Sequence, residues 1–525
     1  MKARRVVSLL AASAVLFARA AHADSSITLE GTVVDDGLDH VFVDFEVPAG
    51  TAEVQIDHDD QSEENILDWG LYDTAGFRGW GGGNGEPIVV TANAASRSYL
   101  TGPITPGTWR LVIGKAKLVT DPAPYHAVVT LRDVATLPAQ PEREPFVDPG
   151  AVAQGPRWYA GDFHVHSKES GDARPPIDEI VTFAKGRGLD FVELSDHNTT
   201  SQLDFMNDAQ SRAGDFLLLP GVEYTTYAGH ANGIGATAFV DHKIGVGGVT
   251  IEGAVSAFAD QGALFSINHP TLDLGDACIG CAWKHELDGS AIASIEIATA
   301  GSSSLFLQSS LDFWESYAAK GHHIAAVGGS DDHRAGIDVG AFGTPIGSPC
   351  TMVFASELST AAIQQGVRDG RTVVKVRGPD DPMIELSTAD GGVEGVLVKA
   401  TVTGGAGLTA RWVSNGESGA DIEIEGDPAE LELDVASPAG SDAHRYRLEI
   451  WDGAQGVSFS SHVWVEPGSG NPPVVEKVDL VGGGCALSAR ERRIGAFGVA
   501  FTLALVLGAA LRSIRTKRKA SKQKS

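Results

Sequence analysis

The sequence predicts a multidomain protein in which a central α/β domain is flanked by N- and C-terminal β-sandwiches, with a transmembrane helix near the C-terminus. Three observations predict this fold class. Residues 24–137 and 377–467 contain short runs of alternating apolar and polar residues, as half-buried strands do. Residues 158–376 alternate apolar strands with helical periodicity, the pattern of βα units. Residues 494–511 form one apolar segment long enough to span a bilayer.

The composition agrees with a globular protein of several domains. The chain has 525 residues, and about 150 residues per domain gives roughly three or four modules. A hydrophobic content of 43% and 63 glycines indicate a folded chain with many turns. The formal net charge of -28 argues against long nucleic acid as a partner, because phosphates are bound by clustered Lys and Arg. A small-molecule substrate is compatible with this charge, and no pattern predicts an oligomeric state.

The N-terminus predicts export to the periplasm or the cell surface. Residues 1–23 combine a basic start, an apolar run over residues 6–17 and the small-residue motif Ala21-His22-Ala23. This order is typical of a secretory signal peptide, so the mature chain is expected to begin near Asp24. A short buried helix is the alternative interpretation.

The C-terminus predicts a membrane anchor. The apolar helix at residues 494–511 is followed by a basic tail at residues 512–525, which the positive-inside rule places in the cytoplasm. The preceding linker, residues 468–493, contains Gly482-Gly483-Gly484-Cys485. The combination resembles the tripartite C-terminal sorting signals of bacterial surface proteins, particularly the myxobacterial type. This resemblance implies a processed anchor near Cys485, whereas the composition alone is equally compatible with an uncleaved helix.

The remaining boundaries follow from the same patterns. Alternating strands such as residues 41–47 and 108–113 predict the N-terminal sandwich over residues 24–137, and a Pro-rich linker spans residues 138–157. Alternating strands such as residues 445–451 predict a second, immunoglobulin-like sandwich over residues 377–467. Between them, apolar residues from Ile177 to Ala184 lie on one helical face, and residues 305–320 predict another helix. Strands are expected at residues 191–194, 216–219, 263–267, 292–297 and 324–327.

Polar groups that can bind metal follow most of the central strands. His164 and His166 lie two residues apart at a strand end, so both rings point to one face and can reach one cation at about 2.0 to 2.1 Å. The carboxyl ends of parallel barrel strands meet on one face, so groups far apart in sequence are expected to converge there. These groups are His164, His166, His197, Glu223, His230, His269, Asp331 and His333.

The motifs that hold these residues resemble the PHP (polymerase and histidinol phosphatase) metallohydrolases. They are HxH at 164–166, DHN at 196–198, GxE at 221–223, NHP at 268–270 and SDxH at 330–333, in this order within residues 158–376. The resemblance implies a distorted (β/α)7 barrel that binds up to three divalent metals. The stretches 77–80 and 158–162 further resemble the branch named for carbaryl hydrolases (CehA/McbA-like), which also carries an N-terminal sandwich.

The resemblance also implies a set of ligands. A first metal would be held by His164, His166, Glu223 and Asp331, and Glu223 would bridge to a second metal at His230 and His269. A third would take His197, His333 and an acid after HxH. The family has this acid directly after the serine, whereas this chain reads Ser170-Gly171-Asp172, so Asp172 is the candidate. Glu223, Asp331 and Arg334 are the expected catalytic residues, with Arg334 either holding an anionic substrate or pairing with a neighbouring Asp.

Several nearby residues have a second interpretation. Asp162 and Asp196 are expected to hydrogen-bond ligating imidazoles rather than touch metal. Asp332 competes with Asp331, and Glu296 either faces the site or is structural. His40 and His462, outside the barrel, are expected to be ordinary surface or turn residues. Cys278 and Cys281, the only close pair among four cysteines, are expected to form a local disulfide rather than a redox or zinc centre.

The predicted function is hydrolysis by a metal-activated water. Two or three divalent ions of Zn, Mn or Fe suit mixed His and carboxylate ligands, and they lower the pKa of water toward about 7. Phosphoester hydrolysis is the leading expectation, because clustered metals stabilise in-line displacement at phosphorus. Resemblance to the carbaryl branch makes carbamate, amide or carboxylic ester hydrolysis the alternative. A surface binding protein with a relic barrel is the competing class.

Overall fold

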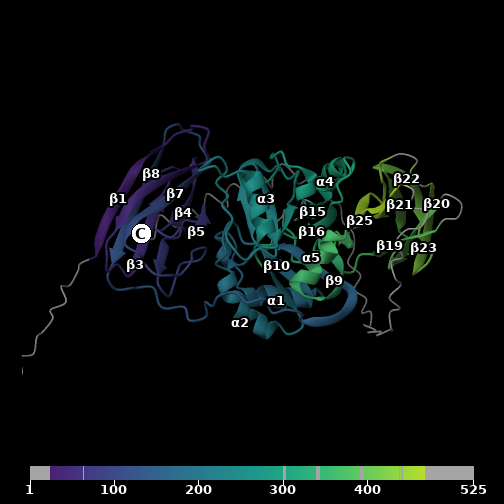
Figure 1. The fold of residues 1–525 in the computed structure, drawn as a ribbon, viewed down its shortest axis with the longest axis horizontal. Helices are drawn as coiled ribbons and strands as arrows, with labels where there is room; N and C mark the ends of the chain where they lie inside the picture. The colour runs from purple at the N-terminus through teal and green to yellow at the C-terminus, as the bar shows by residue number, and fades with distance from the viewer. Residues whose placement is uncertain are drawn as a thin grey trace, which may run out of the picture.

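Three bodies follow one another along the long axis of the molecule (Figure 1). The computed structural model describes residues 24–62, 64–299, 303–337, 343–390, 395–436, 438 and 441–467. The predicted signal peptide, and the predicted linker, helix and tail at 468–525, lie outside these residues. Within the described chain, no helix is long and apolar enough to cross a membrane.

The N-terminal body consists of two four-stranded sheets that enclose one apolar core. Their strand orders are β1-β8-β3-β6 and β2-β7-β4-β5. Ile56, Leu71 and Trp109 are fully buried between the sheets, because alternate residues of each strand point inward. The strands are β1 Ser25–Val33, β2 His40–Val47, β3 Glu53–Asp59, β4 Ile66–Tyr72, β5 Phe77–Gly82, β6 Ile88–Thr91, β7 Gly107–Lys117 and β8 Ala123–Arg132.

The central body has two sheets whose strand ends meet. One contains β9 Ala153–Val165, β10 Phe191–Leu194, β11 Leu217–Pro220, β17 Cys350–Leu358 and β18 Thr372–Lys375. The other contains β12 Glu223–Thr226, β13 Gly229–Ile234, β14 Leu264–Ile267, β15 Ser294–Thr299 and β16 Ala325–Gly329. The helices are α1 Ile177–Gly186, α2 Leu203–Ala213, α3 Ile251–Asp260, α4 Ser303–Ala318 and α5 Thr360–Arg368. Two isolated parallel bridges, Val165 to Asp332 and His197 to Glu223, join the sheets.

The central strands are only partly parallel. β9, β10 and β11 run parallel to one another, as do β14, β15 and β16. The strands β12 and β13 form an antiparallel hairpin, because two residues separate them and a parallel crossover needs about a dozen or more. β17 is also antiparallel to β9. The structure therefore has two mixed sheets in place of the expected ring of parallel strands. The predicted strands and the two predicted helices, α1 and α4, lie at or near the residues expected from the sequence.

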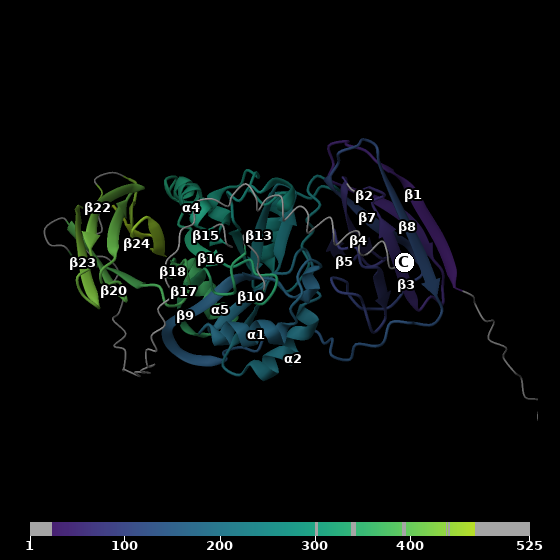
Figure 2. The same ribbon diagram turned by 180° about the vertical axis from the view of Figure 1, so that it is seen from behind.

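The C-terminal body shares a sheet with the central one (Figure 2). β18 pairs with β25 in antiparallel register, with Val374 opposite Phe459, so the sheet continues past the boundary predicted at residue 376. A second sheet, β19-β20-β23, packs on it through the buried residues Val398 and Trp412. The strands are β19 Met383–Asp390, β20 Gly395–Thr403, β21 Thr409–Ser414, β22 Glu417–Glu423, β23 Ala429–Ala436, β24 His444–Asp452, β25 Gln455–Ser460 and β26 Val463–Val465.

A buried charge cluster connects α4 to the C-terminal body. Glu315 accepts hydrogen bonds from Arg445 at 2.5 Å and from Arg447, and its carboxylate lies 3.2 Å from His462 Nε2. His462 is 8% exposed and stacks on Trp314, so its predicted surface position is wrong. Burial raises the pKa of Glu315, but the hydrogen bond to His462 and the two guanidinium groups lower it to about 2.

Replacing Glu315 should weaken this contact. We expect Glu315→Gln to lower the free energy of unfolding by about 3 kcal/mol, because the buried Arg445 guanidinium loses its counter-ion and Arg447 keeps only Glu449. The pKa of Glu315 is lower in the folded state than in the unfolded state. Its contribution to folding stability is therefore fully present above the unfolded-state pKa of 4.5 and is lost as the pH falls toward 2. The difference between variant and wild type should therefore shrink in acid. Chemical denaturation at several pH values measures both effects.

The matched control is Asp208→Asn, which breaks an exposed pair between Asp208 and Arg212. An exposed pair contributes about 0 to 1 kcal/mol. Equal losses for the two variants would contradict a structural role for Glu315.

Candidate metal centre

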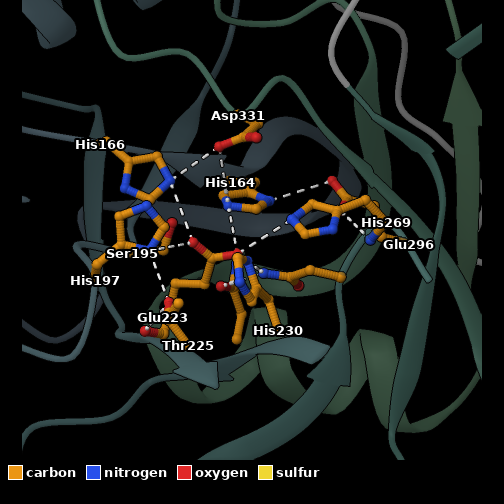
Figure 3. A network of polar contacts seen from close by, with 12 residues as sticks. His164, His166, Ser195, His197, Glu223, Thr225, His230, His269, Glu296 and Asp331 are labelled. Carbon is orange, nitrogen blue, oxygen red and sulfur yellow. Dashed lines mark hydrogen bonds and ion pairs between the residues drawn. The ribbon is translucent and has the colours of Figure 1, made fainter. Parts of the chain in front are cut away.

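Eight imidazole and carboxylate groups from both central sheets converge at one place, and Figure 3 labels all of them except His333. They are His164, His166, His197, Glu223, His230, His269, Asp331 and His333. His164 lies near the end of β9, Glu223 begins β12 and His230 lies in β13, whereas the others follow strand ends. His269 and Asp331 have positive φ values of 27° and 55°, which non-glycine residues rarely adopt. Such strain is tolerated where the surrounding structure enforces it, as in functional sites.

Glu223 lies at the centre of these groups and is 1% exposed. One oxygen, Oε1, lies 3.3 Å from His164 Nε2, 3.2 Å from His230 Nδ1 and 3.3 Å from His269 Nε2. The other, Oε2, lies 2.7 Å from His197 Nδ1 and 3.6 Å from His166 Nε2. The carboxylate thus divides the histidines into two sets, as a bridging ligand between cations does.

Asp331 completes the first group of ligands. Its Oδ1 lies 3.0 Å from His166 Nε2 and 3.3 Å from His164 Nε2. Two ligands at about 2.1 Å from one cation are separated by about 3.0 to 3.4 Å, so these distances fit a shared ion. The neighbouring Asp332 instead accepts backbone N–H groups of Arg334, Gly336 and Ile346.

His230 and His269 form the second group together with the sulfur of Cys281. Their ligand atoms lie within 4.8 Å of one another, and all three residues are buried. Cys281 is bonded to Cys278, which confirms the predicted local disulfide. Glu223 Oε1 contacts both histidines and supplies the carboxylate of this group.

The third group lies on the open side of the site. His166, His197 and His333 have ligand atoms within 4.8 Å of one another. Asp172 Oδ2 lies 3.4 Å from His197 Nε2 and 3.2 Å from His333 Nε2, so the displaced acid reaches both rings. The side chains of Asp172, His197 and His333 are 53%, 22% and 26% exposed, whereas the residues of the first two groups are buried except for Asp331, which is 17% exposed. Burial lowers the pKa of His333, but the Asp172 carboxylate raises it to about 9.

The N-terminal body holds the loop that carries Asp172. Ser98 donates a hydrogen bond from its hydroxyl to the Glu169 carbonyl at 2.6 Å, and Arg97 donates to the Ala173 carbonyl at 3.0 Å. Between them, Gly171 has a φ of 80°, and a Cβ there would lie 2.9 Å from the Gly81 carbonyl oxygen. The loop is therefore fixed on both sides of Asp172 by β5 and by the segment that follows β6.

The donor set fits divalent cations. Buried atoms without a hydrogen-bond partner in the described chain include Nε2 of His164 and Nε2 of His166. Leaving such polar atoms buried and unpaired costs about 1 to 3 kcal/mol each, and a shared cation would satisfy both. Imidazole with carboxylate ligation suits Zn, Mn or Fe.

Other buried acids organise the backbone around the ligands. Asp162 accepts the backbone N–H groups of His164, Ser330 and Gly347, and Asp196 accepts hydrogen bonds from Ser167. The prediction that these two acids hydrogen-bond ligating imidazoles is therefore wrong. Glu296 does face the site: its Oε1 lies 3.5 Å from His164 Nδ1, and its Oε2 accepts the His269 backbone N–H at 2.8 Å.

Two orienting residues are absent from the sequence-based prediction. The Thr225 hydroxyl lies 2.7 Å from His197 Nδ1, and Asn268 Nδ2 donates to Glu223 Oε1 at 3.0 Å. Thr225 is two residues after Glu223 on β12, so strand alternation could have placed it on the same face. Arg334 is half-buried directly after His333.

Comparison with known proteins gives no matching family model and no matching curated protein. Among solved structures, the chain resembles a two-domain protein of Bacteroides vulgatus containing a predicted PHP-like metal-dependent phosphoesterase. The identity is 19% and the TM-score 0.37, over 62% of this chain and 100% of that one. A proposed metal-dependent phosphoesterase of Bifidobacterium adolescentis has 15% identity and a TM-score of 0.26, over 40% and 94% of the two chains. Similarity at this level assigns no function to the chain. A proposal for its function therefore has to be argued from the geometry of the site.

Loosening the loop that carries Asp172 should lower metal binding at the third group of ligands and leave the other two groups unchanged. We expect Ser98→Ala and Arg97→Ala together to lower metal affinity at this group by about tenfold to a hundredfold, because residues that orient ligands have effects of this size. Elemental analysis during graded chelation should show one ion lost early. Arg411→Ala, in a C-terminal surface pair with Asp421, is the control and should keep the wild-type profile. An unchanged profile in the double variant would contradict the role of the N-terminal body.

Proposed function

We propose that this protein is an exported metal-dependent hydrolase, and specifically a phosphoesterase that acts on a small substrate. The observation that carries the proposal is the position of Glu223, whose two oxygens face different sets of histidines. A carboxylate in this position allows neighbouring cations to share one ligand. Divalent cations held in this way lower the pKa of water toward about 7 and polarise a substrate oxygen.

The residues of the chain have separate tasks in this proposal. Glu223 and Asp331 hold the buried cations, and Thr225 and Asn268 orient their ligands. The exposed group of Asp172, His197 and His333 is where a substrate can enter. Arg334, adjacent to His333, is proposed to hold an anionic group of the substrate.

Phosphoester substrates fit the charge of the loaded centre best. Four carboxylates, Glu223, Asp331, Asp172 and Glu296, do not neutralise three divalent cations, so a centre that holds three ions would be cationic. A cationic, largely buried centre stabilises the charge that develops on the oxygens of a phosphoryl group. Carbamate, amide and carboxylic esters develop less charge and are the alternative substrates.

Export and anchoring are proposed from the two ends of the chain. Residues 1–23 carry the signal pattern, and residues 494–511 with the basic tail carry the anchor pattern. The hydrolase would then act outside the inner membrane, held there by the helix or by a processed anchor near Cys485.

Replacing the bridging carboxylate should abolish turnover. Glu223→Gln keeps the shape of the side chain, but an amide cannot bridge two cations, so we expect activity to fall at least about a thousandfold, about 4 kcal/mol in barrier. Metal content should fall with it. Glu179→Gln, at an exposed position of α1, is the control and should retain both. Turnover by Glu223→Gln at the wild-type rate would refute the proposal.

The bond that is hydrolysed can be tested directly. Chelated protein should lose activity and regain it with Mn or Zn, measured on bis-p-nitrophenyl phosphate and 1-naphthyl methylcarbamate in parallel. We expect the phosphodiester to be the better substrate, whereas preference for the carbamate would favour the alternative. A binding protein with a relic barrel predicts no turnover of either, and a double replacement of His164 and His166 by Ala would then change nothing.

A further inference from the structure

The disulfide Cys278–Cys281 lies directly beside the second group of ligands. The sulfur of Cys281 and the ligand nitrogens of His230 and His269 lie within 4.8 Å of one another. Cys281 is 1% exposed, and its carbonyl oxygen lies 3.3 Å from His269 Nδ1. A sulfur at this position is close enough to join the two histidines on one cation after a small adjustment.

The loop that carries the disulfide is fixed against the strands of the site. Gly280 has a φ of 78°, and a Cβ there would lie 2.6 Å from both the Thr226 carbonyl oxygen and Tyr227 Cα. The loop therefore packs on the end of β12, the strand that begins at Glu223. Downstream, the Trp283 backbone N–H donates to the Pro270 carbonyl at 2.9 Å, next to His269. Cys281 is thus held between the strand of Glu223 and the turn of His269.

A sulfur bound in a disulfide and a free thiolate differ as ligands. The thiolate is the form of cysteine that binds metal, and zinc accepts it at about 2.3 Å alongside imidazole and carboxylate. In the oxidised protein, Cys281 carries no charge and leaves a coordination position to water or substrate. In a reduced protein the same sulfur could occupy that position.

We propose that Cys278–Cys281 is a redox switch on the second metal site, in which reduction makes Cys281 a ligand beside Glu223, His230 and His269. The inference rests on the proposed function, because it assumes that a cation occupies this group. Catalytic zinc sites keep an open position and structural sites are closed by a fourth protein ligand. Reduction would therefore convert an open site into a closed one and suppress turnover.

A dithiol reductant supplies the two electrons and two protons that reduce the disulfide. A thiolate of the reductant attacks the sulfur of Cys278, which is half-buried and more accessible than Cys281. The Cys278–Cys281 bond breaks, Cys281 leaves as the thiolate, and a mixed disulfide forms at Cys278. The second thiol of the reductant resolves it, so two electrons and two protons yield two cysteine thiols and one reductant disulfide. The Cys281 thiol loses its proton on binding the cation. Oxidation by a disulfide oxidant reverses these steps.

The test uses cobalt, because a thiolate ligand gives Co²⁺ a near-ultraviolet charge-transfer band that imidazole and carboxylate ligands do not. Full-length protein is stripped with a chelator, loaded with Co²⁺ alone and examined before and after addition of a phosphine, a reductant that adds no thiolate. We expect the band only in the reduced protein. Turnover should be mostly lost with it and restored on reoxidation.

Two matched variants identify the sulfur. Cys278→Ala leaves Cys281 free and should show the band without reductant, whereas Cys281→Ala should show none even when reduced. The other cysteine of the described chain, Cys350, is buried and common to both variants. A band that persists in Cys281→Ala overturns the proposal, as does its absence from reduced wild-type protein that binds cobalt. The wild-type comparison keeps the test valid if a variant fails to fold.

The failure of this inference is distinguishable from failure of the proposed function. If the oxidised protein binds cobalt but hydrolyses neither the phosphodiester nor the carbamate, the proposed function fails, while the band still supports or overturns the switch. If the oxidised protein binds no cobalt, the metal centre and the switch are overturned together.

Discussion

The burial of the Glu223 carboxylate is the constraint on which the central body depends. A buried charge is costly unless it is paired, and this one is surrounded by five imidazoles supplied by both sheets. Its backbone also links the sheets: the Glu223 N–H donates to the Ser195 carbonyl at 3.2 Å, and the Glu223 carbonyl accepts from Asn198 at 3.0 Å. The two sheets therefore meet at this residue, through the bridge between His197 and Glu223, which is one of the two isolated bridges that join them.

Asp162, Asp196 and Asp332 accept backbone N–H groups instead of contacting the ligand rings, and this explains how strained residues are kept in place. Asp162 joins β9 to the segments at Ser330 and Gly347 through three accepted N–H groups. Burial raises the pKa of Asp162 to about 7, although these N–H groups lower it. With the Asp331 backbone N–H bonded to the His164 carbonyl at 2.8 Å, the positive φ of Asp331 is enforced from two sides. Asp331 can then face His166 without relying on a cation for its position.

Local signals in the sequence are sufficient to predict the strands and the polar residues at their ends, because both depend on neighbours a few positions away. The apolar run at residues 191–194 is β10, and the HxH spacing places His164 and His166 together. Contacts between distant segments have no such signal. Ser98 and Glu169 are 71 positions apart, and nothing around either predicts their bond. The pairing of β18 with β25, and the burial of His40 and His462 between bodies, are missed for the same reason.

These long-range contacts make the N-terminal body part of the site rather than an independent module. Tyr227, four residues after Glu223, donates a hydrogen bond at 2.6 Å to Asp68 of β4, whose pKa is raised to about 6 by burial. Phe77 stacks on Phe239 with ring centroids 3.5 Å apart, and His40, predicted at the surface, stacks on Tyr227 instead. Domains joined by small polar contacts tend to move, whereas an interface of buried aromatic rings and paired polar groups resists separation. The loop that carries Asp172 and the strand that begins at Glu223 are therefore both held against the N-terminal body.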